Sequence, residues 1–425
     1  MFWTPSAARA ERLASRSKMT DVRSGLIFRR NSRTRLAIRH HLTMPRAPRD
    51  KAASNLVAEW FGHRVHPTVT ATPAALADQQ TRRCPLLSLA TESTRVCIKS
   101  GVSSGVCTIS STSNGTRQDW LVCPYRALDQ DLVQAATRRL FDITAGREVV
   151  IRPAVTLARD VVRSELLAVL ARGGAAFVYM QDKLGGEMSL RGSPQSPELS
   201  FDVTLIELTA GVPAPTVGRY AILEVQTMDF HGSYRHAVKD LDDALRLHPT
   251  AFHEMVRNNN TWLSNRIEGP NIANVFKRTL YQMLLKFRLA GQGFCAGTAL
   301  AIPAAVWDSW QRHLGAPELT LASDGTFRLA HPTTPVEPRA WIYIFDLDAG
   351  SETSPNPLVI SMVIGTDVDT MAHYAFKAAP DAVLAAGGPG SLVLDAIRVR
   401  LATWWPELGP PRRQRRAQST GEAPT

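Results

Sequence analysis

The chain has 425 residues, of which 44% are hydrophobic, so it can bury a sizeable core in one large or two medium domains. No apolar run approaches the ~18 residues that a membrane-spanning helix needs, and no stretch has the pattern of a secretory signal peptide. We therefore expect a soluble, intracellular protein with no membrane partner. The net charge of +11 fits a polyanionic partner, although charged tails are commonly only solvated.

Most of this charge lies at the two ends of the chain. Residues 1–50 hold twelve Arg or Lys and three acidic residues, a net charge of +9, and show little periodicity. Residues 1–54 are predicted to be a disordered basic extension, with Met19 and Met44 as alternative starts and an organelle presequence as a further alternative. Residues 407–425 are predicted to be a disordered tail, and its basic cluster is Arg412, Arg413, Arg415 and Arg416.

Residues 55–126 are predicted to form a small metal-binding module. The module would open with a short amphipathic helix, LVAEWFG, and an extended piece, HRVHPTV. Four cysteines follow within a stretch rich in Gly, Ser and Thr, and without a secretory signal two disulfides are not expected. One tetrahedral thiolate site is predicted, with four unrelated buried thiols as the alternative. The four are Cys84, Cys97, Cys107 and Cys123, and Cys295 is expected to be a core thiol.

The rest of the chain alternates helical and extended patterns, typical of an α/β fold. Helices are predicted at 125–140, 161–171, 236–247, 272–290, 306–314 and 391–405, and strands at 175–180, 294–303 and 340–345. The helix at 272–290 has a clear apolar face, formed by Phe276, Leu280, Met283, Leu284 and Phe287. Four basic residues of this helix are expected off that face, either contacting phosphates or solvated: Lys277, Arg278, Lys286 and Arg288.

The most informative stretch is 200–234, where two strands, 201–208 and 219–227, flank a turn rich in Gly and Pro. Asp202 stands near the start of the first strand. Glu224 and Gln226 stand two residues apart on the second, so they project from the same face. Two carboxylates at one sheet edge are suitable ligands for a hard cation such as Mg²⁺. The alternative is that both acids simply face solvent.

The strings LEVQTMDFHGSY and QDKLGGEMSL…SPELSFDVT closely resemble the catalytic region of the NotI-type restriction endonucleases. That family is similar to the PD-(D/E)xK nucleases, with glutamine in place of the usual lysine. The resemblance extends to DWLVCPYRALD and EGPNIANVFKRTLYQM and covers about 55–406. It implies an endonuclease-like α/β core at 127–406, with a central mixed sheet flanked by helices, and an iron site at the four cysteines. Zinc also accepts four thiolates, so the two metals stay open. Glu187 matches a family acid that could serve a second metal, or is an inert surface acid.

The resemblance implies a bacterial, cytoplasmic type II restriction endonuclease. Such an enzyme would use Mg²⁺ to cut both strands of DNA at a GC-rich palindrome, leaving 5′-phosphates. Asp202, Glu224, Gln226 and Glu187 would form the catalytic site. A palindromic target predicts a homodimer, and a companion DNA methyltransferase is implied. The alternatives are a non-catalytic, sequence-specific DNA-binding protein and a structure-specific repair nuclease.

The segment after the second strand is a candidate for reading bases. Asp229 can accept a hydrogen bond from a cytosine amino group, and Arg235 can donate two to guanine. Alternatively, this segment only shapes a turn and caps the next helix. The full set of predicted DNA-binding residues is Asp229, His231, Tyr234, Arg235, Lys277 and Arg278.

Overall fold

The computed structural model describes residues 55–99, 101–113, 115–331, 338–348, 350–385 and 389–409. The predicted basic extension, 1–54, and residues 410–425 of the predicted tail lie outside these ranges. The elements named below all fall within them.

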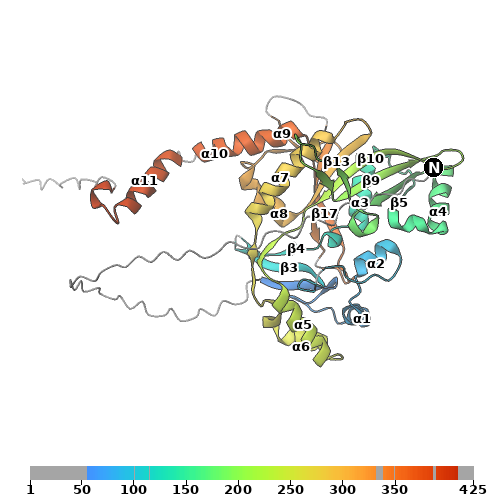
Figure 1. The fold of residues 1–425 in the computed structure, drawn as a ribbon, viewed down its shortest axis with the longest axis horizontal. Coiled ribbons are helices and arrows are strands. Elements are labelled where there is room, and N and C mark those ends of the chain that lie inside the picture. Colours follow the sequence, from blue (N-terminus) through green and yellow to red (C-terminus); the bar gives the residue numbers. More distant parts are fainter. Residues whose placement is uncertain are drawn as a thin grey trace, which may run out of the picture. The chain divides into compact units, whose positions relative to one another are not determined.

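A nine-stranded mixed sheet is the centre of the fold, in the order β14-β15-β17-β16-β13-β10-β9-β6-β5 (Figure 1). Its middle strands β10, β13 and β16 are parallel, whereas β9 runs antiparallel to both β10 and β6. The predicted mixed α/β fold, a large sheet flanked by helices, is confirmed at this level. The strands are β5 (Val149–Pro153), β6 (Ala175–Met180), β9 (Val203–Thr209), β10 (Thr216–Val225), β13 (Cys295–Pro303), β14 (Leu319–Leu321), β15 (Phe327–Leu329), β16 (Ala340–Leu347) and β17 (Leu358–Thr366).

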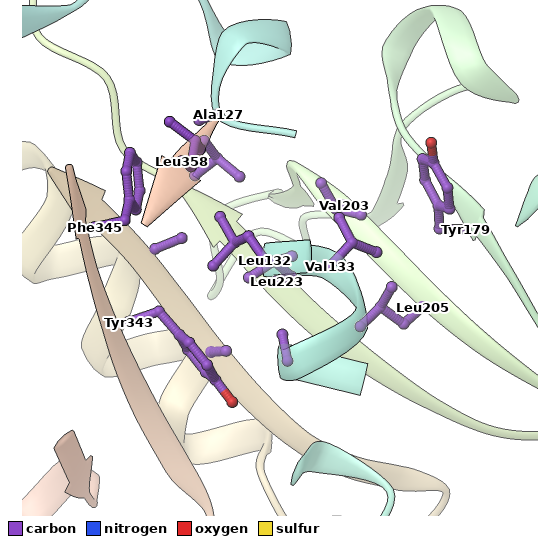
Figure 2. Packing of buried hydrophobic residues seen from close by; sticks show 14 of the residues in the cluster. Ala127, Leu132, Val133, Tyr179, Val203, Leu205, Leu223, Tyr343, Phe345 and Leu358 are labelled. Atoms are coloured by element: carbon purple, nitrogen blue, oxygen red, sulfur yellow. The ribbon is translucent and has the colours of Figure 1, made fainter. Parts of the chain in front are cut away.

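One face of the sheet is covered by helix α3 (Gln130–Leu140), which starts behind an Asp129 cap. Its side chains Leu132 and Val133 meet Val203, Leu205 and Leu223 from the sheet, as Figure 2 shows. These sheet residues alternate along β9 and β10, as a period of two requires. The expected helix at 125–140 is thus shorter, because Pro124–Arg126 forms a separate 3-10 turn.

The other face of the sheet is covered by helices α4 (Asp160–Ala171), α7 (Ile272–Leu289), α8 (Ala304–Trp310) and α9 (Val368–His373). The alternate residues Leu300 and Ile302 of β13 pack here, while Ala299 and Ala301 face α3. The predicted helices at 161–171 and 272–290 are confirmed, as are the strands at 175–180, 294–303 and 340–345.

Residues 55–126 form a four-stranded sheet with two short helices. Its order is β2-β1-β3-β4, so the predicted opening helix is wrong. All six residues of β1 are buried, so both faces of this strand are covered and its side chains show no alternation of burial. A turn with positive φ at Phe61 and Gly62 then returns the chain. The elements are β1 (Asn55–Trp60), β2 (His63–Arg64), α1 (Pro73–Thr81), α2 (Pro85–Thr91), β3 (Val106–Ser113) and β4 (Thr116–Leu121).

The remaining elements are small sheets and peripheral helices. Two ribbons pair β7 (Met188–Leu190) with β8 (Leu199–Phe201) and β11 (Phe230–Gly232) with β12 (Ile267–Pro270). The other helices are α5 (Arg235–Leu247), α6 (Phe252–Asn258), α10 (Ala379–Ala385) and α11 (Pro389–Leu401). In the part of the chain that the structure describes, no single helix is long and apolar enough to cross a membrane. One bent pair, Val368–Ala385 with Gly390–Leu401, passes that test by length and composition.

Candidate metal and DNA site

The β9–β10 hairpin brings the two predicted carboxylates together. Leu223 pairs with Val203 across the hairpin, so Glu224, the next residue, comes opposite Asp202. Leu223 and Val203 face α3, and alternation therefore turns Glu224 toward the face that α7 covers. Asp202 is exposed in the gap between β8 and β9, while Glu224 is buried at the end of β10.

Two reciprocal hydrogen bonds hold this pair of acids. The backbone N–H of Asp202 donates to Glu224 Oε1 at 3.2 Å, and the backbone N–H of Val225 donates to Asp202 Oδ2 at 3.1 Å. Each strand thus fixes the carboxylate of the other. The two acids are held close together even though like charges repel, because each carboxylate gains an N–H donor.

Helix α7 supplies a cation that the sequence prediction placed wrongly. Lys286 was expected off the apolar face of the helix, yet its side chain is only 2% exposed and its Nζ donates to Glu224 Oε2. Burial, followed by the negative charge of Asp202, raises the pKa of Glu224 to about 7, and Lys286 opposes this rise. The sequence does contain a signal for the burial of Lys286, because this residue comes three residues after Met283, within the apolar stripe of the helix.

Gln226 is anchored from the same helix. The hydroxyl of Thr279 donates to Gln226 Oε1, and Gln226 Nε2 donates to the carbonyl of Thr227. Thr279 was not predicted as a site residue. A cavity of about 30 Å³ lies between the hairpin and the helix, which is enough for a water molecule or a small ion. Its lining includes Asp202, Glu224, Gln226, Thr279, Gln282 and Met283.

Glu187 lies close enough to Asp202 for the charge of that carboxylate to affect its pKa. It precedes β7, which pairs with β8, the strand that leads into Asp202. Partial burial, followed by the negative charges of Asp202 and Asp182, raises the pKa of Glu187. The structure thus gathers a third acid near the first two, on an exposed side.

The predicted DNA-binding residues lie beyond the end of β10. Asp229 and Arg278 form a half-exposed ion pair of 2.7 Å between this segment and α7. Burial, followed by the charge of Asp229, raises the pKa of Tyr234, which packs against a hydrophobic cluster just before α5. The other three side chains are exposed: His231, Arg235 and Lys277. The backbone N–H of Arg235 donates to the Ser233 hydroxyl at 3.1 Å, so this segment also shapes the turn into α5.

The four predicted cysteine ligands line one apolar cavity of about 10 Å³. Cys84 caps α2, where its sulfur accepts the Leu87 N–H at 3.5 Å, and Cys97 accepts the Gly105 N–H at 3.4 Å. Cys107 lies on β3, and Cys123 precedes the 3-10 turn at Pro124. The fifth thiol, Cys295, is buried at the start of β13, as predicted.

The thiols of this cavity differ in acidity. Hydrogen bonding from Cys107 lowers the pKa of Cys123 to about 6, aided by the positive charge of Lys99 and opposed by burial. The same bond, together with burial, raises the pKa of Cys107, and burial raises that of Cys84 to about 11. Cys123 is therefore favoured as a thiolate over Cys84 and Cys107.

No protein-family model matches this chain, and a comparison with curated proteins also finds no match. Within the described ranges, no three His, Cys, Asp or Glu side chains are already arranged to hold a metal ion. A metal ion held by all four cysteines would therefore require their side chains to move closer together.

Proposed function

We propose that the chain is a metal-dependent endonuclease that cuts double-stranded DNA at a specific site, a type II restriction enzyme. The observation that carries this proposal is the reciprocal hydrogen bonding of Asp202 and Glu224 beside a small polar cavity. Oxygen ligands at one sheet edge suit Mg²⁺. The endonuclease-like core of the PD-(D/E)xK type belongs to the same proposal.

The residues around the cavity have separate roles. Asp202 and Glu224 would hold a divalent cation, which when bound lowers the pKa of a coordinated water and neutralises charge on the phosphate. Gln226 is fixed at both ends of its amide and would orient the attacking water by hydrogen bonding. Glu187 would complete a second cation position on the exposed side.

DNA would lie across the exposed groups beyond β10. Arg235 and the Asp229–Arg278 pair offer donors and acceptors that suit a GC-rich target, while Lys277 and His231 would contact the backbone. A palindromic site matches the symmetry of a two-fold homodimer, and a companion methyltransferase would protect the host DNA.

The four cysteines would hold one structural iron or zinc ion. All four cysteines line one small cavity, and the sulfurs of Cys84 and Cys97 already accept backbone N–H groups. Tetrahedral thiolate sites suit either metal.

Digestion of plasmids of known sequence tests this function. With Mg²⁺ the full-length protein should give discrete bands, and sequencing of the ends should show 5′-phosphates at one palindrome; EDTA should abolish cutting. Binding without any cutting would instead favour a non-catalytic DNA-binding protein. Cutting confined to branched or damaged DNA would favour a repair nuclease.

A further inference from the structure

Helix α7 carries a buried cation for which the proposed function has no role so far. The ammonium of Lys286 donates to Glu224 Oε2 and is almost fully shielded from solvent. Burying an ammonium is costly unless it is paired, so lysine rarely occupies such a position. The helix thus holds one positive charge at a fixed place behind the carboxylates.

The surroundings of this cation are otherwise acidic. Lys286 acts electrostatically on both Glu224 and Glu187, and Asp202 acts on the same two acids. Lys183 also influences Glu187, but its ammonium is exposed and bonded to Asp182 at 2.9 Å. A phosphodiester entering this site would meet three carboxylates. Its transition state adds negative charge to the phosphate oxygens, so fixed positive charge is needed.

The geometry lets α7 act on both strand residues at once. Thr279 and Lys286 are seven residues apart, two helical turns, and they contact Gln226 and Glu224 respectively. A lysine ammonium has three N–H donors. Among the described residues, Glu224 is the only hydrogen-bond partner of the Lys286 ammonium.

We propose that Lys286 is a positioning residue that holds the Glu224 carboxylate in place and supplies the site with its fixed positive charge. This rests on the proposed function. In the step it assists, a water oxygen bonds to phosphorus and the P–O3′ bond breaks. The attacking water gives its proton to solvent and O3′ takes one from solvent, while Lys286 keeps its own protons.

Single-turnover cleavage by full-length protein in Mg²⁺ tests the role. Lys286→Met keeps the length of the side chain without its charge, and the cleavage rate should fall by about 10²-fold or more, the order seen when a charge-stabilising group is lost. Binding of the same DNA in Ca²⁺ should be unchanged. The matched control is Lys239→Met, which removes an exposed lysine from α5 and should leave the cleavage rate unchanged.

Moving the charge separates an electrostatic role from a purely structural one. Gln226 contacts α7 beside Glu224, so a lysine at 226 would bring an ammonium to the same acids. The double variant Gln226→Lys/Lys286→Met should cut about tenfold faster than Lys286→Met. A tenfold gain corresponds to the return of a small part of the stabilisation of the transition state. If Lys286→Met does not fold, Lys286→Arg takes its place: it keeps the charge and should cut faster than Asp202→Ala.

Each outcome decides the matter. Equal cleavage by wild type and Lys286→Met would overturn the role of Lys286 alone and leave the proposed function standing. A lower melting temperature of Lys286→Met, together with a folded Lys286→Arg variant that cuts no faster than Lys286→Met, would reduce Lys286 to a structural partner. A folded Lys286→Arg variant as inactive as Asp202→Ala would also overturn the proposal. No cleavage by the wild type in Mg²⁺ would overturn both proposals.

Discussion

The carboxylate site and the four-cysteine cavity are two small sites built in opposite ways. The two carboxylates come from a hairpin of the central sheet, and helix α7 supplies Lys286, 62 residues after Glu224; each of these three side chains has a hydrogen-bond partner. The cysteines lie within forty residues, one on strand β3 and the others on a helix cap and loops, around an apolar cavity lined by Phe61 and Leu87. The first holds hard oxygen atoms in place, and the second gathers soft sulfur atoms.

This difference indicates what each site depends on. Asp202 and Glu224 are positioned by sheet register, which exists without any ligand. The cysteine segment contributes short helices and turns, and its geometry would gain most from a bound ion. We therefore expect changes at the carboxylates to affect chemistry, and changes at the cysteines to affect folding.

The largest expected effect is on cleavage. Asp202→Ala or Glu224→Ala removes one of two ligands to the same cation, and the cleavage rate should fall by more than about 10³-fold. Specific DNA binding in Ca²⁺, measured by gel shift, should persist. Asp395→Ala, at an exposed acid of α11, is the control and should cut normally. A near-normal rate in either site variant would show that the carboxylates are not metal ligands.

The cysteine site should respond through stability. Purified protein should contain about one iron or zinc ion per chain. Cys97→Ser should release it and lower the free energy of unfolding by about 2 kcal/mol or more. Elemental analysis and thermal melting check both effects, with Cys295→Ser as the control that keeps its metal. Metal-free protein with stoichiometric disulfides would rule out the thiolate site.

The pH response should distinguish the two sites further. Burial, and then Asp202, raises the pKa of Glu224 from its ordinary 4.5 to about 7, so folded protein keeps a proton that the unfolded chain loses in this window. This acid therefore makes metal-free protein less stable as pH rises from 4.5 to 7, by about 3 kcal/mol in all.

Cation binding needs the carboxylate form of Glu224. Affinity for Mg²⁺ should therefore increase as pH rises toward 7, with proton release on binding at pH 6 and little at pH 8. Calorimetry in two buffers of different ionisation enthalpy measures this. Glu224→Gln should abolish the proton release, and release that persists in this variant would assign it to another group.

A smaller effect on cleavage is expected at Arg235, the residue proposed to read bases. The Arg235 side chain is exposed at the start of α5, so its removal should hardly change stability. Arg235→Ala should cost ~1–3 kcal/mol and relax selectivity at one base pair. Cleavage of single-base variants of the target checks this, with Arg246→Ala, near the other end of α5, as the control. Uniformly weaker cutting would place Arg235 on the phosphate backbone instead.

The smallest effect should follow deletion of residues 1–43, which lie outside the described ranges. Their charge predicts phosphate contacts only, so the cut sequence should not change. Each lost contact should flatten the slope of log K against log salt by about one unit. A truncated protein that cuts different sequences would show that the segment reads bases.

Much of the fold was predictable because its signals are local. The hairpin of β9 and β10 follows from two apolar runs around a Gly/Pro turn, and the apolar stripe of α7 gave its bounds within one residue. The prediction of an opening helix was wrong because β1 is buried on both faces, so its hydrophobic pattern shows no alternation typical of a strand. The place of Lys286 within the apolar stripe of α7 hinted at its burial, but its partner Glu224 lies 62 residues away, and no local pattern contains that pairing.

The tip of the β9–β10 hairpin is a suitable place to attach a label. Residues 210–214 at its tip are exposed, and the strands between the tip and the acids are paired from Thr216–Thr209 to Leu223–Val203. A strand rises about 3.3 Å per residue and eight residues separate the tip from Asp202, so the tip lies about 26 Å from the carboxylates. Extra residues there should be accommodated without altering the pairing near Glu224. A fluorophore or a fused protein could therefore be attached at the tip to measure the proposed binding to DNA.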